Sequence, residues 1–83
     1  MKTNDIRRGV LKVLLACDGV PMPEPALLSA VVEFVRPRPT GNDVLAVISD
    51  LEGRGFIAGL SDELTSERTW TLTDKGTHRA REL

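Results

Sequence analysis

The sequence predicts an α+β domain in which three helices are followed by a two-stranded antiparallel hairpin and a short C-terminal helix. Apolar residues recur at helical spacing in three successive segments between residues 5 and 51, and two short alternating segments follow them across a polar gap. With 83 residues, the chain is long enough for one hydrophobic core and too short for two, so residues 1–83 are expected to form a single domain. Because aromatic residues make up only 4% of the chain, that core must be mainly aliphatic.

The first helix is expected over residues 5–17, with Thr3 or Asn4 as its N-cap. Its apolar stripe follows helical spacing and consists of Ile6, Val10, Val13, Leu14 and Cys17. Gly19 lies in the Asp-Gly-Val-Pro segment that follows, and it is expected to end the helix in a left-handed conformation.

The second helix is expected over residues 24–35. Pro21 and Pro23 precede it and Pro25 lies in its first turn, and a helix tolerates proline only before or within its first turn. It is apolar around most of its circumference, which places it in the centre of the domain. A third helix follows, with Asn42 as the favoured N-cap and a capping pair of Thr40 and Asp43 as the alternative. Its inward face is expected to consist of Val44, Val47, Ile48 and Leu51.

Two strands are expected after the third helix, over residues 56–60 and 70–72. In the second strand Trp70 and Leu72 alternate with threonines, as in a strand with one buried face. Residues 61–68 between the strands form a polar tip, and Thr73 is expected to cap the final helix. This order of helices and strands is that of a winged helix, in which the hairpin is the wing.

Two motifs carry a resemblance to a known family. Residues 51–57 read Leu-Glu-Gly-Arg-Gly-Phe-Ile, and residues 70–76 read Trp-Thr-Leu-Thr-Asp-Lys-Gly. Together they are similar to small bacterial winged-helix regulators of the MarR and PadR type, in which a Leu-Thr-x-x-Gly motif follows the second wing strand. More loosely, the whole chain resembles small winged-helix proteins of unknown role from Mu-like phages and prophages. The resemblance implies DNA binding, with the third helix in the major groove and the wing against the DNA backbone.

The charge distribution limits what the resemblance implies. The net charge is -1, and residues 42–69 carry two basic residues against six acidic ones. The outward face of the third helix holds no Arg, Lys or Gln, the usual readers of base edges, and consists of Asn42, Asp43, Ala46, Ser49, Asp50 and Gly53. Asp43 and Asp50 would repel phosphates if they were unpaired. Asn42 alone remains to read base edges, so little direct base readout through this helix is expected.

Contacts with DNA phosphates are predicted instead, and with them a small regulatory DNA-associated protein of the phage or mobile-element type. The candidate residues are Arg36, Arg38, Thr40 and Asn42 next to the start of the third helix, with Ser49 and Arg68 as peripheral contacts. A second basic surface would form if the two termini packed together, and it would consist of Arg7, Arg8, Lys12, Lys75, His78, Arg79 and Arg81.

A different class of function stays open beside this one. The third helix and the acidic wing would then dock on a basic protein partner without any DNA contact, through Asp43, Ala46, Asp50, Asp62 and Glu63. The sequence also leaves a homodimer open, because Leu11 and Leu15 lie off the apolar stripe of the first helix. These two leucines need cover, either from the C-terminal segment of the same chain or from a second subunit.

Catalysis is not expected. His78 and Cys17 are the only residues of their types, and they show neither the spacing of a catalytic triad nor that of a metal site, so no cofactor or metal is predicted. A single cysteine forms no intrachain disulfide, and no apolar run approaches the ~20 residues that span a bilayer. A cytoplasmic protein without a membrane partner is therefore expected.

Overall fold

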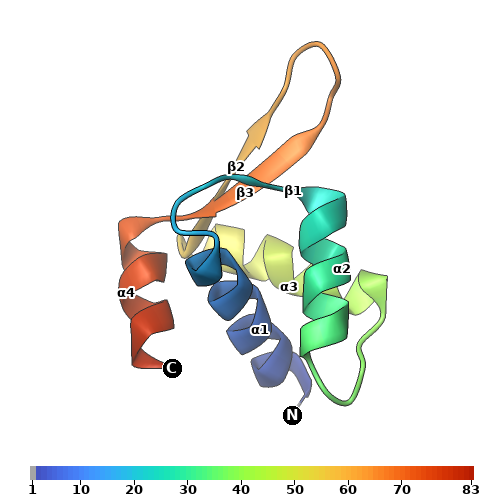
Figure 1. Cartoon of the computed structure of the whole chain (residues 1–83), viewed down its shortest axis with the longest axis vertical. Helices are drawn as coiled ribbons and strands as arrows, with labels where there is room; N and C mark the ends of the chain where they lie inside the picture. The colour runs from blue at the N-terminus through green and yellow to red at the C-terminus, as the bar shows by residue number, and fades with distance from the viewer. Residues whose placement is uncertain (1) are drawn as a thin grey trace.

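The computed structural model describes residues 2–83, so Met1 lies outside it. The elements are α1 (Lys2–Ala16), β1 (Met22–Pro23), α2 (Glu24–Phe34), α3 (Gly41–Gly53), β2 (Ile57–Ser61), β3 (Arg68–Leu72) and α4 (Asp74–Glu82). Figure 1 shows the helices packed together at one end of the molecule, with the β2–β3 hairpin projecting from them as a wing. The α+β winged-helix fold predicted from the sequence is confirmed.

The sheet has three antiparallel strands in the order β1-β3-β2, where the sequence predicted two. The additional strand, β1, is two residues long and pairs Met22 with Trp70 and Pro23 with Thr69. So short a segment shows no alternation of apolar and polar residues, and proline is tolerated only because β1 is an edge strand. The ladder between β2 and β3 reaches Ser61 and Arg68, so the wing strands extend further into the polar stretch than predicted.

The core is aliphatic except for Trp70, which is 1% exposed. The indole N–H of Trp70 donates to Glu24 Oε1 at 3.2 Å, which satisfies the polar group of this buried side chain. Gly59 faces Trp70 across the sheet, where a Cβ atom would lie 2.8 Å from the indole ring. The buried apolar residues are Ile6, Val10, Leu11, Leu14, Leu27, Val31, Val35, Val44, Val47, Ile48, Leu51, Ile57, Trp70 and Ala80.

The start of α1 differs from the prediction. The helix begins at Lys2, so Thr3 and Asn4 lie inside its first turn and the prediction of either residue as the N-cap is wrong. The side chain of Asn4 accepts a hydrogen bond from Arg7 Nη1 at 3.0 Å, so it binds a side chain of the next helical turn and does not cap the helix. The end of the helix agrees better, because α1 stops at Ala16 and Gly19 has a φ of 84°.

The N-terminus of α3 follows the alternative that the sequence offered. Thr40 Oγ1 accepts from the Asp43 N–H at 3.1 Å, and Asp43 Oδ2 accepts from the Thr40 N–H at 3.2 Å. This reciprocal capping box begins the helix at Gly41, so the favoured prediction of Asn42 as the N-cap is wrong. The predicted cap of α4 is confirmed, since Thr73 Oγ1 accepts from the Gly76 N–H at 3.0 Å.

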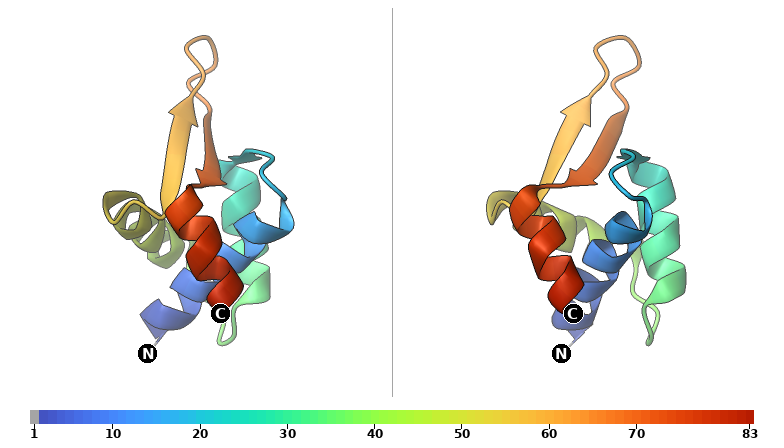
Figure 2. Two further views of the ribbon diagram at one scale, coloured as in Figure 1. Left: turned by 90° about the vertical axis from the view of Figure 1, so that its left-hand side faces the viewer. Right: turned by 60° about the vertical axis from the view of Figure 1, so that its left-hand side comes forward.

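The C-terminal helix packs on α1, as both views in Figure 2 show. Leu11 is 4% exposed, and Lys12 Nζ donates to the Leu83 carbonyl oxygen at 2.7 Å. Of the two kinds of cover proposed for Leu11 and Leu15, the C-terminal segment of the same chain is what covers Leu11. Leu15 is half-buried at the edge of the core, and a homodimer contact there stays a prediction.

Candidate nucleic-acid interface

The exposed face of α3 is the centre of the candidate interface. Val44, Val47, Ile48 and Leu51 face the core as predicted, and the side chains on the opposite face are small or polar. Asn42, Asp43, Ala46 and Ser49 are exposed, whereas Asp50 is only half-exposed. A shallow hollow of about 440 Å³ runs along this face beside the N-terminal half of α1.

Asp50 is neutralised by two arginines, although the sequence analysis treated it as an unpaired carboxylate. Its Oδ2 accepts from Arg7 Nε at 3.1 Å, and its Oδ1 accepts from Arg54 Nε at 3.0 Å. Arg7 comes from α1 and Arg54 is the C-cap residue of α3. The hydrogen bond from Arg54 is the main cause that lowers the pKa of Asp50 below its usual value; desolvation opposes it, and the charges of both arginines add to the lowering. The repulsion expected between an unpaired Asp50 and phosphates is therefore absent.

Asp43 is also engaged, because its carboxylate completes the capping box at the start of α3. A carboxylate at a helix N-terminus is stabilised by the partial positive charge there, which reduces its effective charge toward a ligand. The outward face of α3 is therefore less acidic than the sequence indicates, because both of its aspartates have partners within the fold.

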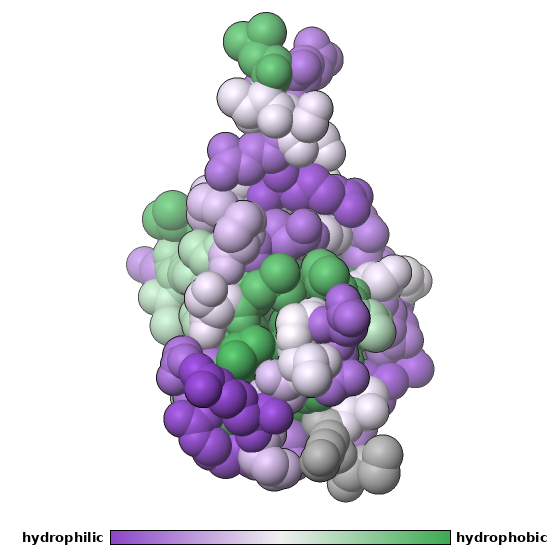
Figure 3. Space-filling model, turned by 90° about the vertical axis from the view of Figure 1, so that its right-hand side faces the viewer, coloured by the Kyte–Doolittle hydropathy of each residue, from purple (hydrophilic) through white to green (hydrophobic). Residues whose placement is uncertain are grey.

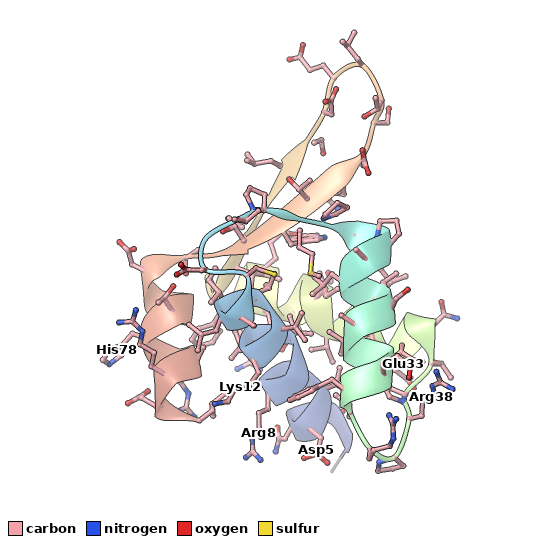
Figure 4. The ribbon with its side chains drawn as sticks, in the orientation of Figure 1. Asp5, Arg8, Lys12, Glu33, Arg38 and His78 are labelled. Atoms are coloured by element: carbon pink, nitrogen blue, oxygen red, sulfur yellow. The ribbon has the colours of Figure 1, made fainter. Side chains whose placement is uncertain are left out.

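The segment between α2 and α3 holds the predicted phosphate contacts Arg36 and Arg38. Arg36 Nη1 donates to the carbonyl oxygens of Glu33 at 2.7 Å and Val35 at 3.0 Å, and so satisfies free carbonyl groups at the end of α2. Arg38 pairs with the Glu33 side chain, and Figure 4 shows these two groups together beside the end of α2. Both arginines are exposed, but both already have partners.

The remaining predicted nucleic-acid contacts lie in two places. Thr40 and Asn42 lie at the start of α3 next to Arg38, while Ser49 lies further along the exposed face of the same helix. Arg68 is separate from them, because it belongs to the wing and its guanidinium lies 5.0 Å from the centre of the Trp70 ring. The fold thus brings the predicted contacts together along α3 and leaves Arg68 apart.

The tip of the wing, residues 62–67, is exposed and acidic. Asp62 Oδ1 accepts from the N–H groups of Leu64 and Thr65 and so holds the turn. Figure 3 shows a mainly hydrophilic wing with an apolar group at its tip, where Leu64 is 96% exposed. Asp62 and Glu63 therefore lie at the far end of the wing from α3, so the residues predicted for protein docking do not form one continuous surface.

The predicted second basic surface is partly assembled by the packing of α4 on α1. A groove of about 370 Å³ between α1, the end of α3 and α4, the arginine groove, is lined by Arg7, Arg8, Arg54 and Arg79 together with Asn4, Leu11, Leu51, Phe56 and Leu83. Lys12 and Lys75 donate to the backbone carbonyls of Leu83 and Arg54, and neither lines the groove. His78 and Arg81 are also outside it, and Figure 4 shows His78 on the far side of α4 from α1.

Arg54 lines this groove but was not among the predicted site residues. The spacing of Asp50 and Arg54, four residues apart at the end of a predicted helix, was the signal that indicates their pairing. The approach of Arg7 had no such signal, because it comes from a helix 43 residues away in the sequence.

Cys17 and His78, the two residues considered for catalysis, do not come together. Cys17 Sγ lies 3.8 Å from Met22 Sδ at the end of α1, and His78 lies 4.0 Å from Glu82 on α4. Among residues 2–83, no helix is both long and apolar enough to cross a membrane.

Comparison with known proteins identifies the fold. No protein-family model and no curated protein matches the sequence. Among solved structures, MepR from S. aureus in its DNA-binding conformation superposes with a TM-score of 0.77 at 18% identity, covering 95% of this chain and 54% of MepR. The S. aureus MepR–DNA complex gives 0.71 at 21% identity over 94% of this chain and 59% of MepR. A MepR mutant from a multidrug-resistant S. aureus clinical isolate gives 0.74 at 19% identity, over 93% and 52%.

MepR is a winged-helix regulator of the MarR family, so the resemblance in fold stated from the sequence is confirmed. At these identities the likeness concerns the fold alone. This chain spans between 52% and 59% of the MepR chains that it matches.

Proposed function

We propose that this protein is a small DNA-associated regulatory protein that contacts the DNA backbone along α3. Its phosphate contacts are Arg38, Thr40 and Asn42 at the start of α3, with Ser49 further along the helix. Arg36 has mainly a structural role at the end of α2, and Arg68 is peripheral. The phage or mobile-element origin is part of the proposal and rests only on the resemblance of the sequence.

The observation that supports DNA association is the pairing of Asp50 with Arg7 and Arg54. It removes the main electrostatic objection to placing α3 against DNA, because the carboxylate that would repel phosphates is held between two guanidinium groups. The small side chains of Ala46 and Ser49 permit a close approach of the helix to a duplex. The likeness of the fold to MepR, which has been crystallised with DNA, is consistent with this placement.

The proposed mode of binding has little sequence selectivity. The exposed face of α3 offers Asn42 as its only side chain suited to a bidentate contact with a base edge. Contacts with phosphates position a protein on DNA without reading the sequence. We therefore expect the affinity for different duplexes to be similar and to depend strongly on salt.

The test is a titration of a non-specific duplex by wild-type protein and by Arg38→Gln over a series of salt concentrations. Each phosphate contact adds about 0.9 to the slope of log affinity against log salt, so the variant should lose about that much. Arg81→Gln is the matched control, because it makes the same change of net charge on an exposed position of α4. Equal slopes for the two variants would exclude Arg38 as a phosphate contact, and a wild-type chain that binds no duplex at low salt would refute DNA association.

A second candidate function is supported by the tip of the wing. Three acidic residues and the almost fully exposed Leu64 suit a basic protein partner better than DNA. In this candidate the docking residues are Asp62 and Glu63, and Asp50 takes no part because its carboxylate is already paired. Failure of the wild-type chain to bind DNA at low salt would favour this function over the first.

A further inference from the structure

The arginine groove has more basic side chains than acidic side chains that pair with them. Arg7, Arg8, Arg54 and Arg79 line it, whereas the acidic side chains that pair with them are Asp50 and Glu82. Arg8 forms no ion pair within residues 2–83, and Figure 4 shows it extending from α1 into solvent. A protein of net charge -1 thus gathers a local surplus of positive charge at one place.

The groove is continuous with the exposed face of α3. Arg7 lines both the arginine groove and the hollow that runs along α3 past Ala46 and Asp50. Asp50 fixes the positions of Arg7 and Arg54 at the border between the two hollows. A ligand that covers the face of α3 therefore comes within reach of the groove at the end of that helix.

Basic residues consequently lie at both ends of α3. Arg38 lies before its N-terminus, and Arg54 and the groove lie at its C-terminus. The helix has 13 residues, which corresponds to a length of roughly 19 Å at the usual rise per residue. The major groove of B-DNA is about 12 Å wide, so a helix of this length placed across it brings its two ends to the two backbones.

We infer that the arginine groove is a second phosphate-binding site, which holds the DNA strand opposite to the strand held by Arg38. This inference rests on the proposed DNA association and assigns the second strand to α1 and α4. Arg8 and Arg79 contact the phosphates directly, and Asp50 is a positioning residue that holds Arg7 and Arg54 beside them.

The test compares Arg8→Gln with Arg81→Gln in the same duplex titration. Both residues are exposed, neither forms an ion pair within the described part of the chain, and both substitutions remove one positive charge. Arg8→Gln should lower the salt slope by about 0.9 and weaken binding roughly eightfold at 0.1 M salt, whereas Arg81→Gln should change neither clearly. Arg8→Lys keeps the charge and should keep most of the slope.

The outcomes separate the inference from the function on which it rests. If wild type binds the duplex and Arg38→Gln weakens binding, but Arg8→Gln behaves like Arg81→Gln, the groove is not a phosphate site and the proposed function stands. If wild type does not bind the duplex at low salt, both are overturned. Circular dichroism of each variant verifies that the helices are retained.

An independent measurement locates the contact. Addition of the duplex should shift the backbone amide NMR signals of residues 4–11 and 78–82 together with those of residues 38–50. Shifts confined to residues 38–50, with none in residues 4–11 or 78–82, would overturn the inference even if the affinities of the variants differed.

Discussion

Substitution of Gly76 by alanine should destabilise the protein at the junction between the wing and α4, although the same change normally strengthens a helix. Gly76 is the third residue of α4, where alanine is favoured over glycine by about 1 kcal/mol. A Cβ atom at this position would lie 1.8 Å from the carbonyl oxygen of Phe56. That oxygen belongs to the backbone and accepts hydrogen bonds from the Thr73 N–H and hydroxyl, so it cannot move away freely.

Relief of this contact requires a backbone shift of more than an ångström, and overpacking of this kind costs about 3 kcal/mol. After the gain in helix propensity is subtracted, Gly76→Ala should lower the free energy of unfolding by about 2 kcal/mol. For a domain of this size that corresponds to a fall in melting temperature of roughly 8–16 °C. The arginine groove should be disturbed as well, because Arg79 and Leu83 reach it only when α4 is docked.

The assay is urea denaturation followed by the fluorescence of Trp70, the single tryptophan of the chain. Gly53→Ala is the matched control, because Gly53 is also helical and has nothing within 4 Å of its added Cβ position. It should leave stability unchanged or raise it by up to about 1 kcal/mol. A Gly76→Ala variant as stable as wild type would show that α4 is not held against Phe56 as described.

Two further predictions concern α3. Thr40→Ala should lower stability by about 1 kcal/mol in thermal unfolding, because it removes the acceptor of the capping box, whereas Asn42→Ala should cost much less; equal costs would contradict the assignment of Thr40 as the cap. Asp50 contributes stability above its ordinary pKa of 3.8, and this contribution is lost as the pH falls through its lowered pKa in the folded state. The gap in urea midpoint between wild type and Asp50→Asn should therefore narrow from pH 7 to pH 3, and a constant gap would refute the role of ionised Asp50.

Much of the fold was predictable because it depends on interactions between residues close in the sequence. The spacing of Val44, Val47, Ile48 and Leu51 defines the buried face of α3, since a helix repeats every 3.6 residues whatever surrounds it. The cap at Thr73 depends on a side chain and an amide three residues apart. The choice of Thr40 over Asn42 was less predictable, because both residues suit an N-cap and their separation is only two residues.

The candidate site was predicted less completely than the fold. Arg38, Thr40 and Asn42 could be predicted as one group because they lie next to the start of a predicted helix. The basic residues near the two termini were predicted to form a surface only if the termini packed together. The charge of α3 was misjudged, because formal counting treats Asp50 as a free carboxylate. Its neutralisation needs Arg7, whose position follows from how α1 packs on α3.

By itself, the sequence determined the order of helices and wing, the aliphatic core and the inward face of α3, because apolar periodicity and capping act over a few residues. It did not determine the whole inward face of α1, where Leu11 is buried, or of α2, where Phe34 is 58% exposed although this helix was predicted to lie at the centre. Only the tertiary structure decided the third strand at Met22 and Pro23, the pairing of Asp50 with Arg7, and the arginine groove between α1 and α4. Each of these joins residues more than 40 positions apart, and such contacts form only when packing of the core brings distant segments together.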